Sequence, residues 1–493
     1  MQLRNLLAPL LPVRISGDDQ VAITGITADS REVRPGDLFV CLSGFTVDGH
    51  AFAQQAMQQG AAAVLAEREL NLDGTVAVVP DTRRAAAMIA DKFYGSPTAA
   101  LKVIGVTGTN GKTTTTHLLD HILRHRQKRT GLIGTIHMRI GDVSEELKNT
   151  TPDALFLQKS FRRMLDAHTE YAIMEVSSHA LDMGRVWGVD FHTAVFTNLT
   201  QDHLDYHQTM EKYAAAKSLL FAQLGNRYRH DSPKTAVLNA DDPVSAQFAR
   251  ATAARVLTYG IDQPADVRAE EIKLTSGGVS FTARTFAGDV KLCLRLMGKF
   301  NVYNALAALT AALVEGISLA DIKEALEAVE GVSGRFEAVK AGQDFTVLVD
   351  YSHTPDSLEN ALTTIKEFAR GRVFCVVGCG GDRDRGKRPI MAQIATKYAD
   401  LTVLTSDNPR SEDPEAIIAD MVAGLASVPA SRYLSLPDRR EAIAYAVGRA
   451  GADDVILIAG KGHETYQIIK GQVLPFDDRE AAREAIAALH PKK

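Results

Sequence analysis

Residues 103–114 place an apolar run, a glycine-rich turn and the sequence Gly-Lys-Thr one after another, a combination that could bind phosphate. The run from Val103 to Val106 predicts a buried strand. The residues from Thr113 to Arg126 carry apolar side chains at the spacing of one helix face, which predicts a helix. Strand, glycine turn, Lys112 and helix therefore follow in the order that a phosphate-binding loop requires.

The chemistry of this loop would come from its backbone and two side chains. Glycines let backbone N–H groups approach phosphate oxygens, and the helix N-terminus adds unpaired donors and partial positive charge. Lys112 would reach the terminal phosphates, and the Thr113 hydroxyl would hold Mg²⁺. The nearest fit to the usual spacing is Gly105-x5-Gly111, because position 106 is valine. An ordinary strand-to-helix turn is the alternative, but Gly-Lys-Thr at the helix start favours the phosphate site.

Two further reactive side chains follow predicted strands. Glu175 ends the apolar run from Tyr171, and His203 comes soon after the run Ala194 to Leu199. Ligands of open α/β sheets bind outside the carboxyl ends of the strands, so Lys112, Glu175 and His203 are expected to converge on one crevice. A single histidine is more often structural, but its place between two aspartates after a strand favours a functional role for His203.

Lys217 lies in an apolar helical stretch from Tyr213 to Phe221 and has two interpretations. It is a surface lysine whose stem packs on the protein, or it is a desolvated amine beside a metal site. In the second case its pKa would fall, and the neutral amine could take up CO₂ to form a carbamate. The residues alone leave both open.

Other polar residues also have a structural and a functional interpretation. Asn301 and Asn304 share one face of a helix that is expected to run to Glu315, where they could cap the helix or contact a nucleotide. The loops Thr27 to Arg31 and Gly44 to Gly49 are ordinary connections, or they grip a nucleotide diphosphate together.

The last third of the chain predicts a second doubly wound unit. Strand-like runs ending at Asp350, Val377, Thr405 and Ala459 are each followed by a glycine-rich or charged loop. Cations and carboxylates should therefore gather at one sheet edge. The basic cluster from Arg383 to Arg388 could be a solvated face or part of that edge.

The whole chain limits the functions to be considered. Its 493 residues are enough for two to four domains, and 45% hydrophobic and 23% charged residues are globular values. A net charge of −5 gives no basic field for nucleic acid. We expect no membrane insertion and no secretory signal, since no apolar run is long enough. Four cysteines without a metal-type pair fit a reduced, cytoplasmic setting.

In combination, these motifs resemble those of the ATP-dependent Mur ligases of peptidoglycan synthesis. The matching segments, in chain order, are Thr107–Thr114, Glu175–His179, Thr197–Asp205, Lys217, Asn301–Asn304, Asp350–Pro355 and Asp407–Arg410. The resemblance extends over essentially the whole chain. The phosphate loop alone is shared by a superfamily, whereas the complete set is specific, and its last segment is similar to that of members that use meso-diaminopimelate.

The resemblance implies an α/β fold with three domains. Residues 1–100 would form a small α/β domain that binds the UDP end of the substrate. Residues 101–332 would form the central ATP-binding domain, a P-loop ATPase-like domain with a parallel sheet. Residues 333–493 would form a Rossmann-like domain that binds the amino acid.

The resemblance also implies the reaction. The enzyme would be an ATP-dependent amide ligase that adds meso-2,6-diaminopimelate to the D-Glu γ-carboxylate of UDP-MurNAc-L-Ala-D-Glu through an acyl phosphate. ATP, two Mg²⁺ ions and a CO₂-derived carbamate on Lys217 are the implied cofactors. The chain is expected to act as a cytoplasmic monomer on these small-molecule substrates, without nucleic acid.

The resemblance assigns residues to each part of the site. Catalytic roles are implied for Lys112, Glu175, His203 and Lys217. The implied metal ligands are Thr113, Glu175, His203 and carbamylated Lys217. ATP would contact Gly108, Thr109, Asn110, Gly111, Lys112, Thr113, Thr114, Asn301, Asn304, Arg335 and Asp350. The UDP-substrate would contact Ser30, Asn149, Thr150, Thr151, Ser177 and Arg185, and also the loop Phe45-Thr46-Val47, which departs from the His-Gln-Ala of some members. Diaminopimelate would contact Arg383, Asp407, Asn408, Pro409, Arg410, Gly460 and Glu464.

Three rival functions remain open at this point. An L-lysine-adding member and a folylpolyglutamate synthase-like ligase share the reaction type. A P-loop nucleotide-binding protein without ligase chemistry belongs to a different class, against which the carboxylate and histidine after successive strands count. Phosphate release from ATP that depends on both co-substrates would identify a ligase.

Overall fold

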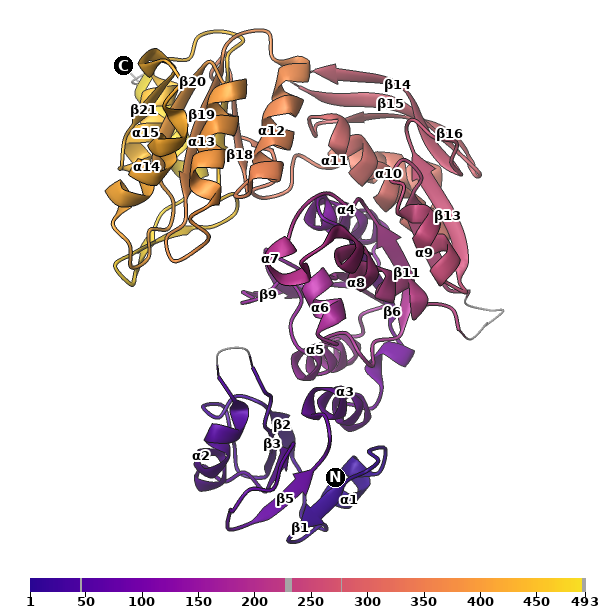
Figure 1. The fold of residues 1–493 in the computed structure, drawn as a ribbon. Helices are drawn as coiled ribbons and strands as arrows, with labels where there is room; N and C mark the ends of the chain where they lie inside the picture. Colours follow the sequence, from indigo (N-terminus) through magenta and orange to yellow (C-terminus); the bar gives the residue numbers. More distant parts are fainter. Residues whose placement is uncertain (45–46, 227–232, 276, 490–493) are drawn as a thin grey trace.

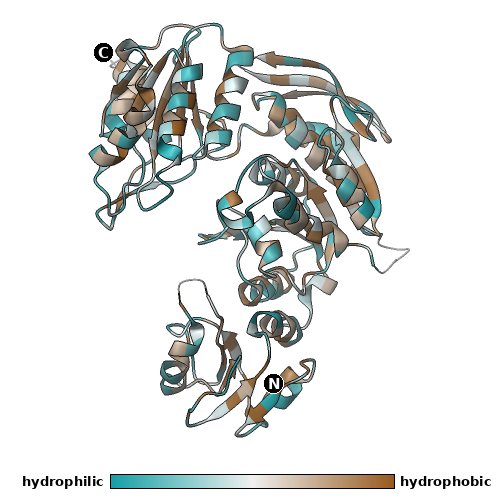
Figure 2. Ribbon diagram, in the orientation of Figure 1, coloured by the Kyte–Doolittle hydropathy of each residue, from teal (hydrophilic) through white to brown (hydrophobic). Residues whose placement is uncertain are grey.

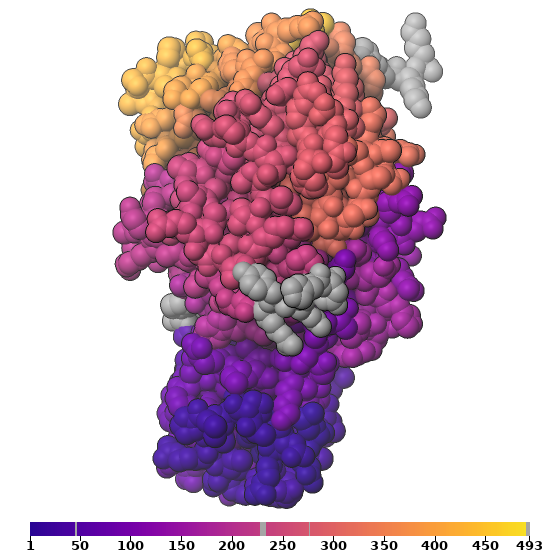
Figure 3. Space-filling model, turned by 90° about the vertical axis from the view of Figure 1, so that its right-hand side faces the viewer, coloured from indigo at the N-terminus to yellow at the C-terminus, as the bar shows by residue number. Residues whose placement is uncertain are grey.

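The computed structural model describes residues 1–44, 47–226, 233–275 and 277–489, so Phe45 and Thr46 of the expected substrate loop lie outside it. Figure 1 shows three parts in chain order, with the N-terminal part at the bottom and the C-terminal part at the upper left. Figure 3 shows the N-terminal part from another side, as a lobe below the rest. Among the described helices, none is long and apolar enough to cross a membrane.

The N-terminal part is built on a five-stranded sheet in the order β1-β5-β4-β3-β2. Its strands are β1 Arg14–Ser16, β2 Gly25–Thr27, β3 Asp37–Val40, β4 Ala63–Ala66 and β5 Thr75–Val78. Its helices are α1 Leu3–Leu7, η1 Gly49–Phe52, α2 Ala53–Gln58, α3 Thr82–Phe93 and η2 Pro97–Ala99. Between β3 and β4 the chain forms η1 and then, without a break, α2.

The middle part is built on an eleven-stranded sheet in the order β16-β15-β14-β13-β12-β11-β6-β10-β7-β8-β9. Its strands are β6 Lys102–Thr107, β7 Thr130–Ile133, β8 Met138–Ile140, β9 Val143–Glu145, β10 Tyr171–Glu175, β11 Phe191–Phe196, β12 Thr235–Asn239, β13 Arg255–Gly260, β14 Val267–Thr275, β15 Gly278–Thr285 and β16 Gly288–Leu294. Its helices are α4 Lys112–His125, α5 Ala154–Asp166, α6 Ser178–Asp182, α7 Leu204–His207, α8 Met210–Ala222, α9 Ser245–Ala251, α10 Lys299–Val314 and α11 Leu319–Ala328.

The parallel sheet expected for the central domain forms only the centre of this larger sheet. Parallel pairing runs from β14 to β7, whereas β15 and β16 at one edge and β8 and β9 at the other pair antiparallel. Two residues join β15 to β16, and hairpins need no crossover helix, so the strand–helix alternation fails there. In Figure 1 the β14–β16 extension reaches α12 of the C-terminal part, and β14 contacts that helix.

Helices cover both faces of the central strands, because successive side chains of β6 point to opposite faces and all of them from Val103 to Thr107 are buried. Ile104 packs with α4, α10 and α11 in one core, whereas Val103 packs with α5, α8 and α9 in another. In Figure 2, α9, α12 and α13 carry hydrophilic residues, coloured teal, on the side that faces the viewer. The carboxyl ends of β6, β10 and β11 consequently lie next to each other at one sheet edge.

The C-terminal part has a six-stranded sheet in the order β17-β18-β22-β19-β20-β21 and a separate hairpin β23-β24. The strands are β17 Glu337–Ala338, β18 Thr346–Asp350, β19 Val373–Cys379, β20 Leu401–Ser406, β21 Tyr433–Ser435, β22 Val455–Ala459, β23 Tyr466–Ile469 and β24 Gln472–Pro475. The helices are α12 Pro355–Phe368, α13 Lys387–Tyr398, α14 Pro414–Val422, η3 Ala423–Leu425, η4 Ala430–Arg432, α15 Arg439–Val447 and α16 Asp478–Leu489.

A buried ion pair holds the carboxyl edge of this sheet. Arg439 and Asp478 are fully buried, and two of the guanidinium nitrogens each lie 2.7 Å from a carboxylate oxygen of Asp478. The same guanidinium donates to the carbonyl of Ser406 at the end of β20 and to that of Ala459 at the end of β22. It therefore fixes two strand ends from which candidate site residues follow.

We expect Asp478→Ala to lower the free energy of unfolding of the C-terminal part by about 3–5 kcal/mol, because Arg439 would stay buried without its carboxylate. Denaturant unfolding with a probe in that part measures the loss. Glu484→Ala removes the exposed partner of Arg440 from the same helix and should shift the midpoint little. Equal shifts in the two variants would contradict the role given to the buried pair.

Candidate active site

The glycine turn after β6 forms a tight loop at the N-terminus of α4. Gly111 has a φ of +85°, and a Cβ there would lie 2.3 Å from Oδ1 of Asn304. A Cβ on Gly108, whose φ is +149°, would lie 1.8 Å from Oγ1 of Thr197. Both positions therefore require glycine. Lys112 folds back over this loop, and its Nζ donates to the carbonyls of Gly108 and Thr109, at 2.9 Å each.

Thr113 lies at the centre of a buried hydrogen-bond network. Its hydroxyl donates to Oε2 of Glu175 at 3.0 Å, and it accepts from Nη2 of Arg335 at 3.0 Å. The carboxylate of Glu175, 1% exposed, also accepts from the backbone and hydroxyl of Thr135. A hydroxyl and one carboxylate beside a phosphate loop fit Mg²⁺, which takes few protein ligands and completes its shell with phosphate and water.

Lys217 is buried rather than a surface lysine. Its Nζ donates to the carbonyl of Gly108 at 2.8 Å and lies 4.5 Å from the ring centroid of Tyr213. Burial, together with the positive charge of Lys112, holds the pKa of Lys217 well below its usual value. A neutral amine at this position is the form that reacts with CO₂. The surface interpretation of Lys217 is therefore wrong.

His203 is the N-cap residue of α7 with a φ of +55°, and its Nε2 lies 3.4 Å from Oδ2 of Asp202. Burial lowers the pKa of His203 to about 4, despite the opposing charge of Asp202. The imidazole, which packs edge-on against His179, is therefore neutral near pH 7. Among the described residues, no three His, Cys, Asp or Glu side chains form a ready metal-binding group, so the expected ligand set of Thr113, Glu175, His203 and Lys217 stays a prediction.

A cavity of about 410 Å³ brings Lys112, Thr113, Glu175 and His203 together. This is the crevice expected from the strand ends. Residues of both the middle and the C-terminal parts line it, including Arg335 and His353. Five of the predicted UDP-substrate residues also line it, namely Asn149, Thr150, Thr151, Ser177 and Arg185. Lys217 lies beneath the loop rather than among the lining residues.

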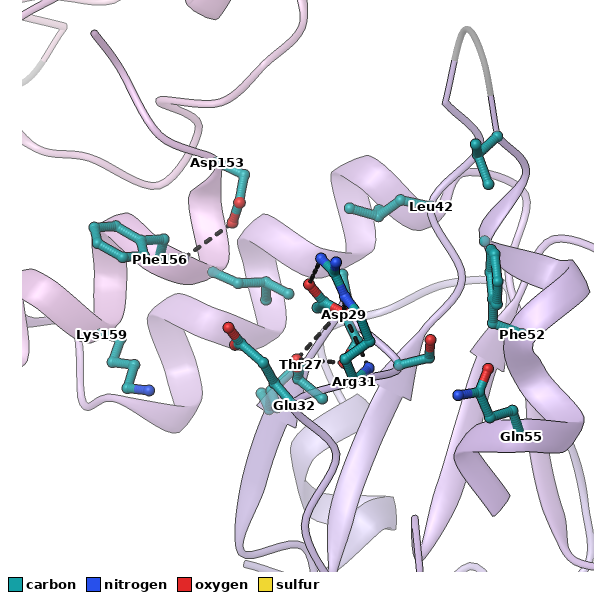
Figure 4. Close-up of a pocket in the computed structure, with 16 residues that line it drawn as sticks. Thr27, Asp29, Arg31, Glu32, Leu42, Phe52, Gln55, Asp153, Phe156 and Lys159 are labelled. Carbon is teal, nitrogen blue, oxygen red and sulfur yellow. Dashed lines mark hydrogen bonds and ion pairs between the residues drawn. The ribbon is translucent and has the colours of Figure 1, made fainter. Parts of the chain in front are cut away.

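Ser30, the sixth predicted UDP-substrate residue, lines a different cavity of about 770 Å³ in the N-terminal part. Figure 4 shows this cavity between the loop of Thr27 to Glu32 and the start of α5. Asp153 and Phe156 line it, whereas Asn149 to Thr151 line the cavity at the phosphate loop. One continuous segment therefore connects the two cavities, so a single elongated ligand could occupy both.

The predicted nucleotide residues outside the loop are buried around it. Asn304 donates to Oδ1 of Asn301 at 2.9 Å, and Asn301 donates to the carbonyl of Met297. Gly298 is the N-cap of α10, so neither asparagine caps that helix. Asp350, whose pKa burial raises, accepts from the backbone N–H of Phe336 at 2.7 Å.

The predicted diaminopimelate residues gather at the carboxyl edge of the C-terminal sheet. Asn408 donates to Oε2 of Glu464 at 2.9 Å, and the buried Lys461 donates to both residues. Arg410 donates to the carbonyl of Gly381 at 2.8 Å. A Cβ on Gly380 would lie 2.9 Å from Nη1 of Arg410 and 3.8 Å from Cγ of Arg383, so the two arginines lie over one glycine. Gly460 similarly lies against Asp407, and Pro409 follows in the segment between β20 and α14.

Most of the basic cluster from Arg383 to Arg388 is structural. Arg388 is fully buried and pairs with Glu412 and Asp420, and Arg385 pairs with Asp420. Arg383 instead donates to the adjacent carbonyl of Asp382. Within the described residues, Arg383 is thus the arginine of this cluster without a carboxylate partner.

Sequence reasoning missed two residues of this region. Asp356 on α12 accepts from Nδ2 of Asn110 at 3.3 Å and from the Thr200 hydroxyl at 3.0 Å, which links the C-terminal part to the phosphate loop. Lys461 was part of a noted glycine-rich loop but had no assigned role. The contact between Asn110 and Asp356 joins residues 246 positions apart, so it leaves no local pattern in the sequence. Lys461 is fully buried although it is charged, and its burial depends on its partners Asn408 and Glu464, which its neighbours in the sequence do not indicate.

Comparisons with known proteins match all three parts of the chain. Residues 106–312 match the Mur ligase middle domain, and residues 334–462 match the Mur ligase, glutamate ligase domain. Residues 22–94 match a model described as Mur ligase family, catalytic domain.

Relatives match over the full length. Proteins from Bacillus cereus and Geobacillus thermodenitrificans, both named UDP-N-acetylmuramoyl-L-alanyl-D-glutamate–2,6-diaminopimelate ligase, are each 57% identical over 486 residues. The matches cover 99% of this chain and 98% and 99% of those proteins. A solved structure of a ligase with the same name has a TM-score of 0.70 and 36% identity, and the match covers 100% of both chains.

We expect Lys112→Ala to weaken ATP binding at least about tenfold, because charge-assisted hydrogen bonds to the phosphates would be lost. Equilibrium titration with ATP and Mg²⁺ measures this change, and circular dichroism checks the fold. Lys397→Ala, an exposed lysine on α13 paired with Glu359, is the control and should bind ATP as the unmodified protein does. Unchanged affinity in Lys112→Ala would remove Lys112 from the phosphate site.

Proposed function

The chain belongs to the Mur ligase family and adds meso-diaminopimelate to UDP-MurNAc-L-Ala-D-Glu in peptidoglycan synthesis, and we propose how its residues divide this ATP- and Mg²⁺-dependent reaction. The observation that carries the proposal is the cavity where Lys112, Thr113 and Glu175 meet residues of the C-terminal part. The relatives' name specifies diaminopimelate, which sets aside the lysine-adding, folylpolyglutamate synthase-like and non-enzymatic alternatives.

The first step joins ATP to the peptide. The γ-carboxylate of D-Glu attacks the terminal phosphorus of ATP, an acyl phosphate forms and ADP leaves. Phosphoryl transfer needs positioning and charge neutralisation more than covalent help from the protein. Lys112 and Arg335 supply positive charge, and Thr113 and Glu175 would hold Mg²⁺, which supplies further charge neutralisation when bound. Asn301, Asn304 and Asp350 would serve the rest of the nucleotide.

The second step forms the amide. The amine of diaminopimelate attacks the acyl phosphate, and the tetrahedral adduct expels phosphate. Asp407, Asn408, Arg410 and Glu464 would hold the far end of the amino acid at the C-terminal sheet edge, with Arg383 and Gly460 beside them. Because the site has walls from two domains, its closure would exclude water from the hydrolysable intermediate.

The UDP-substrate would extend from one cavity to the other along the segment from Asn149 to Lys159 that lines both. Ser30 would contact its nucleotide end, and Asn149, Thr150, Thr151, Ser177 and Arg185 its peptide end. Domain boundaries near residues 100 and 332 fit this division. We assign the reaction to the cytoplasm, with which the free thiols of the described cysteines are compatible.

Lys217 would carry a carbamate in the working enzyme. The proposal is supported by its full burial, its lowered pKa and its contact with the Gly108 carbonyl, since a buried neutral amine gains a charge partner when CO₂ converts it to a carboxylate near Lys112. The carbamate and His203 would complete the ligands of a second Mg²⁺.

We expect Lys217→Ala to lose on the order of 100-fold in activity, because a metal ligand is lost, and acetate should restore part of it by filling the space of the carbamate. Amino-acid-dependent phosphate release measures both effects. Lys212→Ala, an exposed lysine on the same helix, should keep full activity and show no acetate effect. Full activity in Lys217→Ala without acetate would disprove the carbamate role.

Arg410 should select the amino acid. Diaminopimelate carries a second carboxylate at its far end that the guanidinium can bind with two hydrogen bonds, and lysine leaves Arg410 unpaired. The unmodified enzyme should therefore prefer meso-diaminopimelate over L-lysine by orders of magnitude in kcat/KM, and Arg410→Ala should lose most of this preference. Arg385→Ala is the control, since Arg385 already pairs with Asp420. An unchanged preference in Arg410→Ala would overturn the assignment.

A further inference from the structure

Lys461 is a fully buried lysine in the loop directly after β22. It lies between Gly460 and Gly462, whose φ values of +117° and +55° favour glycine. A Cβ on Gly462 would lie 2.7 Å from Cβ of Tyr351, so the chain turns tightly against its neighbour at this point. The Lys461 side chain lies inside the protein, where a charged group needs hydrogen-bond partners.

The Lys461 ammonium binds two of the residues proposed to hold diaminopimelate. Its Nζ donates to Oδ1 of Asn408 at 3.1 Å and to Oε2 of Glu464 at 2.9 Å. Nδ2 of Asn408 donates to the same Oε2 at 2.9 Å, and the backbone N–H of Ile468 donates to Oδ1 at 2.9 Å. Because an ammonium group and a backbone N–H can only donate, the amide oxygen of Asn408 must face them and its NH₂ must face Glu464. Lys461, Asn408 and Glu464 therefore form a closed triangle with one arrangement of donors and acceptors.

This triangle leaves one group of each binding residue for a ligand. Within the described residues, Oε1 of Glu464 accepts no hydrogen bond, and only one N–H of the Asn408 amide is engaged. A carboxylate oxygen can bind an ammonium group, and an amide N–H can bind a carboxylate. Those two charged groups occur together at the far end of diaminopimelate. Lys461 thus determines which atoms of Asn408 and Glu464 remain for the amino acid.

The backbone of Arg410 is connected to the same triangle. Its N–H donates to the carbonyl of Ile468 at 2.9 Å, and its carbonyl accepts from the N–H of Lys470 at 2.7 Å. These bonds hold Arg410 at a φ of +54°, a left-handed conformation that is unfavourable for a residue with a side chain. Since Ile468 also donates to Asn408, the three residues that would meet the far end of the amino acid share one hydrogen-bonded frame.

Stability alone gives little reason for a charge at position 461. Replacing both members of a buried ion pair by apolar residues of similar volume is often neutral or stabilising. Apolar packing does not distinguish the oxygen of the Asn408 amide from its nitrogen, whereas an ammonium group does. Hydrogen bonds from a second layer of residues that lock the rotamers of binding side chains improve the precision of a site.

We propose that Lys461 is a positioning residue for the selection of the amino acid. It does not contact diaminopimelate but orients Asn408 and Glu464 toward the carboxylate and the ammonium of its far end. This inference rests on the proposed binding of diaminopimelate at this sheet edge. Without Lys461 the Asn408 amide can rotate and Glu464 loses its cation, so the amino acid binds more weakly. ATP and the UDP-substrate are held elsewhere and are unaffected.

The test measures kcat and KM for each substrate at saturating concentrations of the other two. Lys461→Met keeps an unbranched apolar stem and removes the ammonium. Its KM for meso-diaminopimelate should rise about tenfold or more, because charge-assisted hydrogen bonds orient both binding side chains. Its preference for meso-diaminopimelate over L-lysine should fall. The KM values for ATP and the UDP-substrate should stay within about twofold, as expected for distant sites.

Lys461→Gln retains an N–H donor and should recover part of the loss, with a KM for diaminopimelate at least about threefold above the unmodified value. Lys366→Met is the matched control, because Lys366 is an exposed lysine of α12 that pairs with Asp400, and it should leave all kinetic constants unchanged. Thermal unfolding shows which variants are folded. An unchanged KM for diaminopimelate in Lys461→Met, or in Lys461→Gln should Lys461→Met not fold, would overturn the inference. Equal rises in the KM values of all three substrates would also overturn it, since a merely structural role produces them.

Glu464→Gln separates this inference from the proposed function. It should raise the KM for diaminopimelate if the amino acid binds at this sheet edge. A rise in Glu464→Gln without one in Lys461→Met overturns the positioning role alone. No rise in either variant refutes the proposed amino-acid site itself.

Discussion

The hydroxyl of Thr113 joins three segments that are far apart in the chain. It lies in the first turn of α4, donates to Glu175 at the end of β10 and accepts from Arg335, 222 residues away. The position of the C-terminal part relative to the phosphate loop depends on this contact and on the second link from Asp356 to Asn110. Because Arg335 comes from the C-terminal part, the phosphate site is complete only when the domains meet.

Burial makes this arrangement specific. Glu175 is almost fully enclosed, and its carboxylate accepts three hydrogen bonds from Thr113 and Thr135. An enclosed carboxylate without such donors would cost several kcal/mol, so other arrangements of the strand ends are disfavoured. The same carboxylate that stabilises the fold is therefore the one available to a cation, and stability and catalysis depend on one group.

The sequence predicted what local patterns determine. The strand, loop and helix around Lys112 and the helix containing Asn301 and Asn304 were found because apolar periodicity and glycines act over few residues. The convergence of Glu175 and His203 with Lys112 followed from strand ends alone. The antiparallel strands β15 and β16 were missed because a parallel sheet was expected for the whole central domain. The contacts of Asp356, the burial of Lys461 and the internal pairing of Arg388 depend on partners distant in sequence, and no local pattern reports them.

The segment from Asn149 to Lys159 lines two separate cavities, which affects how the substrate behaves kinetically. A nucleotide anchored at one end holds the peptide carboxylate near the phosphate loop, so the second contact becomes intramolecular, with an effective concentration set by the length of the linker. Binding energy from the distant anchor can then be used to orient the reacting carboxylate, and removing the nucleotide would lower turnover as well as affinity. Inhibitors that link two weak fragments across this segment would gain affinity in the same way.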